Sequence, residues 1–549
     1  MRRIFFVFFA LSLNSFAEDW KEESVSKQSF FELNGYFRAR MNYLNRCDLG
    51  TYIPMDRLPV GTRMGQGTSH CPVPSSYHSA ENAGKNSNDR PSSLLSGDLR
   101  LRLDPTIHVN EDIRIKGTFD IFDNLVLGHS AGLSGSASYP DSFLTATQFE
   151  LPNHYLNIKR VWAEIDNPVG QFRFGRMPMH FGMGLLYNSG NSMTNDYGDN
   201  VDGLLFTTQV WGHYLTPGFL VSTVSPIQRG GGTGSLGDAG VPYQNTEWGQ
   251  RYSLDPSVAT YTFLMSFAKI DKQSDLEALI QDKRWVLNYG ALASYRMQKN
   301  AWLKDQIQTR DSRVGSASLW ADYYWNTLHM EAEAVGMIGG IKNSTGLWAD
   351  PNQSTPLTIL QGGIAFRSRY GLMANKLGLG LDAGWASGDR AYGMGARPGL
   401  KQTTQKGDAD GSQFGGSDTT LNNFRFNPAY QVDMILFREV IGTITDAFYL
   451  RPHIAYDLNK SFGLRLDVIS SFSHFAESTP GQSRLLGLEF DASATYQSEY
   501  GLFARLQYGL LVPFSGLNHS TSQVPGTLYT DFGTARLASS LQVLAGIAF

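Results

Sequence analysis

The residues of this 549-residue chain that could do chemistry do not form the known patterns of a catalytic site. The sequence holds no P-loop and no His-Glu-x-x-His helix. Its 11 histidines and many serines make chance triads easy to draw, so residue types alone do not support one. We therefore expect neither an enzyme nor a cofactor.

Two acidic segments are candidates for a cation site. Asp408–Gly411 resembles part of an EF-hand calcium loop, but a lysine and a serine stand where that loop has its first and last ligands, so the motif fails. The second candidate consists of Asp196, Asp199 and Asp202, which could bind a cation together with loop carbonyls. A plain polar loop explains these three residues as well. We expect no metal.

The remaining charged residues recur at every second position in long segments. Arg100 and Arg102, for example, alternate with Leu99 and Leu101. If the apolar set of each segment faces lipid, the charged set faces a water-filled interior, either as walls of opposite sign or as ion pairs without selectivity. The candidate pore-lining residues are Arg38, Arg40, Arg100, Arg102, Arg114, Lys116, Glu164, Asp166, Asp467, Glu489 and Asp491.

These segments indicate membrane-spanning strands. Only 17% of residues are charged, 12% are aromatic and 57 are glycine. Alternating segments of about ten residues match the length of a tilted strand that crosses a bilayer. Short and long links alternate, as in barrels with short periplasmic turns and long outer loops. We predict a transmembrane antiparallel up-and-down β-barrel of about 18 strands (16–20), with strands near 31–43, 97–109, 111–123, 156–166, 170–176, 201–209, 218–225, 257–270, 284–297, 314–325, 327–338, 358–369, 375–387, 446–456, 462–473, 485–497, 501–512 and 534–549.

Both ends of the chain carry targeting patterns. Residues 1–17 combine a basic start, an apolar stretch and a small-x-small site, which is typical of a cleaved signal peptide. Residues 18–30 are expected to be a short periplasmic tail, and 31–549 the barrel. The last strand alternates up to Phe549, and a terminal aromatic residue is the form of signal that barrel-assembly machinery reads.

Cys47 and Cys71 are the only cysteines, and they share one stretch rich in Gly, Pro and Ser. Export favours a disulfide between them. A metal site with His70 and His78 is the alternative, although the Cys-x-x-Cys spacing typical of zinc is absent.

Three segments resemble an uncharacterised family of porin-like outer-membrane barrels from Gram-negative bacteria: Arg160-Val-Trp-Ala-Glu164 through Gly175-Arg-Met-Pro178, Tyr197-Gly-Asp199, and Phe426–Glu439. A weaker likeness to general porins rests on Phe172–Arg176 and Phe549. The resemblance covers the mature chain and implies a barrel in the outer membrane; it supplies no substrate and no functional residues.

The sequence thus predicts a porin-like channel for passive diffusion of small polar or charged solutes. A barrel plugged by its third and seventh outer loops, with a structural or attachment role, and a channel specific for sugars or acidic oligomers are the alternatives. The partners expected are outer-membrane lipid and lipopolysaccharide, the barrel-assembly machinery, small polar solutes and, as an open alternative, further copies of the chain. The net charge of −4 gives no reason to expect nucleic acid.

Overall fold

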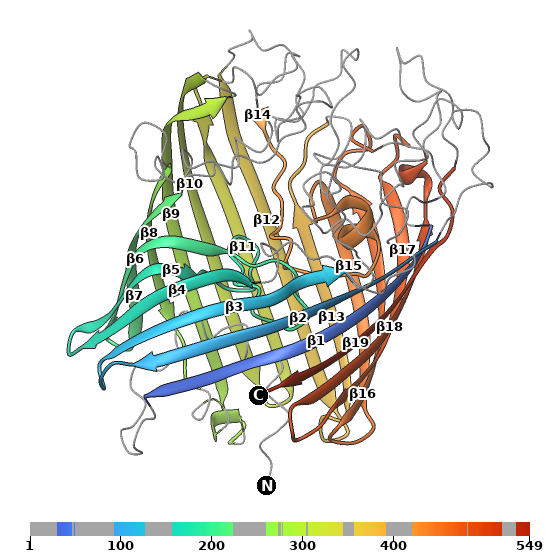
Figure 1. The fold of residues 1–549 in the computed structure, drawn as a ribbon. Coiled ribbons are helices and arrows are strands. Elements are labelled where there is room, and N and C mark those ends of the chain that lie inside the picture. Colours follow the sequence, from blue (N-terminus) through green and yellow to red (C-terminus); the bar gives the residue numbers. More distant parts are fainter. Residues whose placement is uncertain are drawn as a thin grey trace, which may run out of the picture.

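Eighteen long antiparallel strands close into one barrel (Figure 1). The computed structural model describes residues 30–46, 49, 93–126, 156–222, 260–272, 276, 278–280, 282–303, 306–343, 356–390, 420–479, 481–518 and 534–549. The barrel strands are β1 (Phe31–Asn45), β2 (Ser93–His108), β3 (Ile113–Val126), β4 (Leu156–Asn167), β5 (Gly170–Pro178), β6 (Asn200–Val210), β7 (His213–Ser222), β8 (Thr260–Lys269), β9 (Trp285–Leu303), β10 (Gln306–Trp325), β11 (Leu328–Ile341), β12 (Leu357–Leu372), β13 (Leu377–Ala386), β15 (Ala447–Asp457), β16 (Phe462–Ser473), β17 (Leu485–Gln497), β18 (Leu502–Pro513) and β19 (Ala538–Ala548).

Each barrel strand pairs with the barrel strands that precede and follow it in the chain, and β19 closes the ring on β1. The closing register sets Arg38 opposite Gly546 and Met41 opposite Val543. A further two-residue strand, β14 (Thr420–Leu421), pairs in parallel with β12 and belongs to the seventh outer loop. The first residue of β1 and the last residue of β19 lie at the rim that carries the short turns (Figure 1).

The prediction of about eighteen antiparallel strands is confirmed, and its largest boundary errors are at β7 and at the β9–β10 hairpin. The β6–β7 hairpin turns on Trp211 and Gly212, both with positive φ, so β7 starts five residues before its predicted start at 218. The predicted long loop 298–313 is mostly strand, because β9 and β10 stay paired up to Leu303 and Gln306. A bulge near Asp311 breaks the alternation there and hid this extension from the sequence pattern.

The outer wall is an apolar band. On β10 the outward positions run from Gly315 to Trp325, and their neighbours Ile338 and Leu360 on the next strands are more than half exposed. Ten residue steps at about 3.4 Å, tilted by about 40°, give a height of about 26 Å, close to the apolar band of outer-membrane barrels. Among the described residues, no helix is long and apolar enough to cross a membrane.

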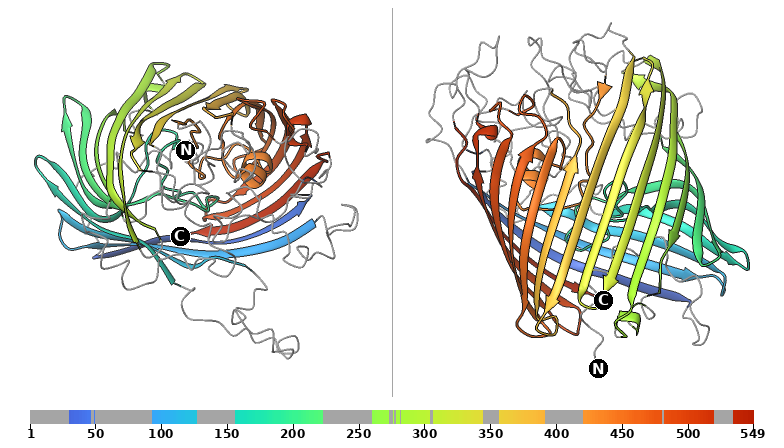
Figure 2. Two further views of the ribbon diagram at one scale, coloured as in Figure 1. Left: turned by 90° about the horizontal axis from the view of Figure 1, so that it is seen from above. Right: turned by 180° about the vertical axis from the view of Figure 1, so that it is seen from behind.

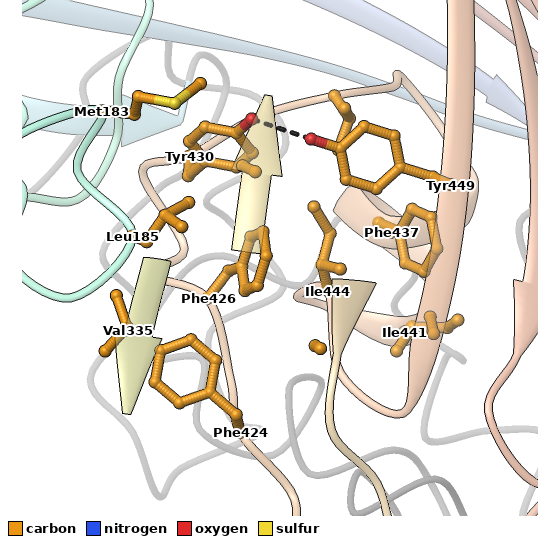
Figure 3. Packing of buried hydrophobic residues seen from close by; sticks show 14 of the residues in the cluster. Met183, Leu185, Val335, Phe424, Phe426, Tyr430, Phe437, Ile441, Ile444 and Tyr449 are labelled. Carbon is orange, nitrogen blue, oxygen red and sulfur yellow. Dashed lines mark hydrogen bonds between the residues drawn. The ribbon is translucent and has the colours of Figure 1, made fainter. Parts of the chain in front are cut away.

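The third outer loop (residues 179–199) and the described second half of the seventh outer loop (residues 420–446) fold into the barrel, as the view from above shows (Figure 2). Met179 and Leu185 of the third loop and Phe424 and Phe426 of the seventh have almost no exposed surface. They share one buried cluster with inward residues of the wall (Figure 3). The barrel therefore encloses a packed apolar core formed by its own loops.

Several predictions fall outside the described residues. These are the signal peptide, most of the N-terminal tail, the loop that carries Cys47, Cys71, His70 and His78, and the segment Asp408–Gly411.

Candidate functional site

A basic wall faces the third loop from inside the barrel. Arg38 and Arg40 of β1 and Arg100 and Arg102 of β2 are all more than nine-tenths buried, on the side opposite the exposed Phe37 and Met41. Arg38 and Arg100 are direct cross-strand partners. Because like charges placed opposite each other destabilise a strand pair, this wall requires carboxylates from elsewhere.

Two of these carboxylates come from the wall itself. Asp98 of β2 accepts a hydrogen bond from Arg38 at 3.0 Å and from Arg40 at 2.8 Å. Asp120 of β3 accepts two from Arg102, at 2.7 and 2.8 Å. Both acids stand at the same alternating positions as the inward cations of their strands. The sequence pattern therefore indicated that they face inward, although neither was among the candidate pore-lining residues.

The third carboxylate is Asp196, which the third loop presents to the wall. It accepts hydrogen bonds from Arg40 at 2.8 Å and Arg38 at 3.3 Å, and Arg100 lies at 3.9 Å. Arg438 of the seventh loop approaches the same carboxylate at 3.7 Å. Burial alone would raise the pKa of Asp196, but Arg40 and Arg38 outweigh that effect and hold its pKa below the usual range. One carboxylate thus ties both loops to the wall.

The third loop is held on the far side of the barrel as well. The backbone N–H of Leu185 donates to Glu333 of β11 at 3.2 Å, and Ser318 of β10 donates to the same carboxylate at 2.7 Å. Glu333 lies near Glu331 and Asp322, and all three are buried. Strands β10 and β11 stand about half the ring away from β1 and β2, so the third loop spans the interior from a basic wall to an acidic one.

A neutral histidine fixes the shape of the third loop. Nε2 of His180 lies 3.0 Å from the carbonyl of Gly182, and Nδ1 accepts a hydrogen bond from the N–H of Ser189 at 3.4 Å. This pattern requires one protonated and one unprotonated ring nitrogen. Burial lowers the pKa of His180 to about 4, which keeps the ring neutral at pH 7.

The two loops also bind each other. Asn427 of the seventh loop donates from its backbone to the carbonyl of Leu185 at 2.8 Å and from its side chain to Asp199 at 2.5 Å. Asp199 accepts a further hydrogen bond from the N–H of Asn188 at 2.8 Å. The loops therefore form one unit inside the barrel.

The segment Val432–Ile441 of the seventh loop contains a short helix. Residues Leu436–Ile441 form one wide turn, in which Glu439 and Val440 both donate to the carbonyl of Ile435. Asp433 caps this turn by accepting from the N–H groups of Phe437 and Arg438. Beside it, Tyr430 and Tyr449 are joined through their hydroxyls at 2.8 Å (Figure 3).

The strand β17 secures the helical turn. Glu489 accepts hydrogen bonds from three consecutive backbone N–H groups, those of Met434, Ile435 and Leu436. Asp491 lies on the same face of the strand and is also buried. Glu489 thus binds the seventh loop. The sequence pattern predicted only that this residue faces inward, not that it binds a loop.

The remaining candidate residues lie in cross-strand ion pairs. Arg114 of β3 donates to Asp166 at 2.6 Å and lies 3.5 Å from Glu164, which Lys116 approaches at 3.3 Å. Glu164 and Asp166 therefore do not oppose these cations across the barrel, because β3 and β4 are neighbours and their charges meet directly. Asp467 accepts from Arg451 at 2.8 Å and Arg465 at 2.7 Å.

The three aspartates considered for a cation do not converge. Asp196 binds arginines and Asp199 binds amides, whereas Asp202 points outward and pairs with Arg176. Among the described residues, no group of three or more histidine or acidic side chains is arranged to hold a metal ion.

Comparisons with known proteins show a likeness of fold only. The outer membrane protein opdK from Pseudomonas aeruginosa has 11% identity and a TM-score of 0.39, covering 94% of this chain and 99% of that one. OccK11 (OpdR) of the same organism has 9% identity and a TM-score of 0.43, covering 94% and 96%. A loop-deletion mutant of OmpT, an outer membrane protein of Vibrio cholerae, has 9% identity and a TM-score of 0.35, covering 94% and 99%.

The solved structures that this chain resembles are outer-membrane β-barrels. No family model matches the sequence, and no curated protein matches it.

Proposed function

We propose that this protein is an outer-membrane channel through which small polar solutes diffuse, and that its third and seventh loops form the constriction. The observation that carries the proposal is the third loop itself, which spans a charged interior between Asp196 at the basic wall and Leu185 at the acidic one. The apolar outer band supports a position in a bilayer, since a closed barrel leaves no backbone group unpaired in lipid.

The charges around the constriction support a preference among solutes. Arg38, Arg40, Arg100 and Arg438 converge near one end of the third loop, and Glu333 lies at its other end. Fixed charges of opposite sign on facing walls orient a polar solute and disfavour an apolar one. In this proposal transport is passive, and the charged residues beside the two loops set the selectivity.

The second candidate function is a barrel plugged by these loops, with a structural or attachment role. The buried apolar cluster favours it, because Phe424, Phe426 and Phe437 fill interior space that a wide channel would leave to water. Both candidates use the same loops, and they differ in whether ions pass the loops in their docked state.

Single-channel conductance of the refolded protein in a planar bilayer separates the candidates. A matched variant replaces residues 428–443 by a short Gly-Ser link, which the geometry allows because Phe426 donates a backbone hydrogen bond to Ile444. Stable steps from the wild type, enlarged in the variant, are expected for the channel. A silent wild type with a conducting variant establishes the plug, and silence from both folded, inserted proteins refutes the channel proposal.

A further inference from the structure

The outer wall carries a basic cluster at the extracellular end of β9–β11. Arg313 of β10 and Lys342, just after β11, expose 64% and 72% of their side chains. Both pair with Asp311 of the β10 bulge, Arg313 at 3.4 Å. Lys299 of β9 is exposed and lies opposite that bulge in the strand register. Asp311 thus pairs with two cations, and with Lys299 on the neighbouring strand the cluster has three cations for one acid, a charge of about +2.

This cluster stands directly above the apolar band. In the strand register, Arg313 lies in one outward row with Met297 and Gly340. The next row towards the periplasmic end contains Tyr295, Gly315 and Ile338, and Ile338 is 67% exposed. Charged side chains therefore begin within one row of the place where the apolar surface ends, which is the height of lipid headgroups in the outer leaflet.

A track of small residues runs down the wall from the cluster. The outward positions below Arg313 on β10 are Gly315, Ala317, Leu319 and Ala321, and the last three lie opposite Gly336, Ala334 and Ala332 of β11. The track runs from Gly315 through Ala317 and Gly336 to Ala334 and Ala332, beside Leu319, which is 61% exposed. A Cβ atom added at Gly336 would have no atom within 4 Å. At the upper end of the track the larger, exposed side chains of Tyr295 and Ile338 flank Gly315.

We propose that this face binds one phosphorylated lipid of the outer leaflet, with its phosphate at Lys299, Arg313 and Lys342 and an acyl chain along the track. The proposal rests on the outer-membrane location given above. The two features are independent observations that point to the two halves of the same molecule: net positive charge suits a phosphate, and a strip of small apolar residues lets a hydrocarbon chain pack closely.

Another outward ion pair of the wall shows why the net charge matters. Arg176 of β5 makes two hydrogen bonds to Asp202 of β6, at 2.7 and 2.8 Å. That pair is neutral as a whole and its guanidinium is already engaged by a carboxylate of matching geometry. The cluster around Asp311 instead has one acid for three cations, so positive charge remains for an external phosphate.

The test uses the purified full-length barrel in detergent, incubated with bisphosphorylated lipid A or with the same lipid stripped of its phosphates, and scores retained lipid by native mass spectrometry. The charge variant is K299Q/R313Q/K342Q, and its matched control removes three exposed lysines of the periplasmic turns, K283Q/K376Q/K460Q. The track variant is Gly336→Leu, and its control is Ala492→Leu on the outward face of β17.

We expect the wild type and both controls to retain the phosphorylated lipid, and the charge variant to bind it about tenfold more weakly or worse. Gly336→Leu should weaken both lipid forms, since the added side chain occupies the track and its Cβ meets no barrel atom within 4 Å. Equal retention of both lipid forms by the wild type, or equal losses in the variants and their controls, would overturn the proposal. Conductance of the same samples reports separately on the channel, so failure of the two proposals is distinguishable.

Discussion

Replacing Asp196 by Asn tests whether the third loop is docked by the basic wall. The change keeps the size of the side chain but removes the one loop charge that Arg38, Arg40, Arg100 and Arg438 share. Removing one partner of a buried ion pair typically costs 3–5 kcal/mol, because the remaining charges stay buried. An amide still forms hydrogen bonds, so we take the lower end, about 3 kcal/mol.

A loss of about 3 kcal/mol multiplies the ratio of undocked to docked loop by about 150. In single-channel recordings of Asp196→Asn we expect frequent openings to a larger conductance level that is rare in the wild type. The reversal potential in a salt gradient should also move towards anion selectivity, since the variant removes one negative charge from the constriction.

Asp202→Asn is the matched control, because Asp202 also pairs with an arginine but lies half-exposed on the outer wall. Exposed pairs contribute about 0–1 kcal/mol, so this variant should record like the wild type. The reasoning fails if Asp196→Asn and Asp202→Asn give the same step sizes, opening frequencies and reversal potentials.

Two further predictions concern the same loops. Burial lowers the pKa of His180 to about 4 in the docked loop, so this ring is protonated more readily when the loop is undocked. Its contribution to the stability of the docked loop is therefore complete above pH 6.5 and is lost as the pH falls towards 4. Recordings from pH 7 to pH 4 should show more frequent openings to the larger conductance level in the wild type, and a smaller increase in His180→Gln. Burial raises the pKa of Asp433 to about 6, so protonation of Asp433 stabilises the docked loops as the pH falls, equally in both proteins. Asn427→Ala removes the hydrogen bond to Asp199 and should cost the contact between the loops about 1–2 kcal/mol, seen as faster amide exchange in residues 185–199 and unchanged exchange in β16.

The alternation of residues determined most of the barrel. A strand with one face in lipid and the other in a polar interior must alternate, so segments such as Phe462–Ser473 could be placed to the residue. The pattern failed where a bulge or a two-residue turn intervened, as at Asp311 and Trp211, because there the period of two is broken or shortened by backbone geometry. Parity also assigned the inward side of Arg38 and Glu489 correctly, but not what each side chain meets.

The partners of those side chains were decided by the tertiary structure. Asp196 lies about 160 residues from Arg38 in sequence, Leu185 lies about 150 from Glu333, and Asn427 about 230 from Asp199. A local pattern records which face a residue occupies, because neighbouring residues share one strand. It does not record which loop folds back across the ring, because that depends on the closure of all eighteen strands and on the burial of apolar loop residues inside them. The strands of the wall could therefore be predicted from the sequence, whereas the arrangement of the two loops forms only once the barrel has closed around them.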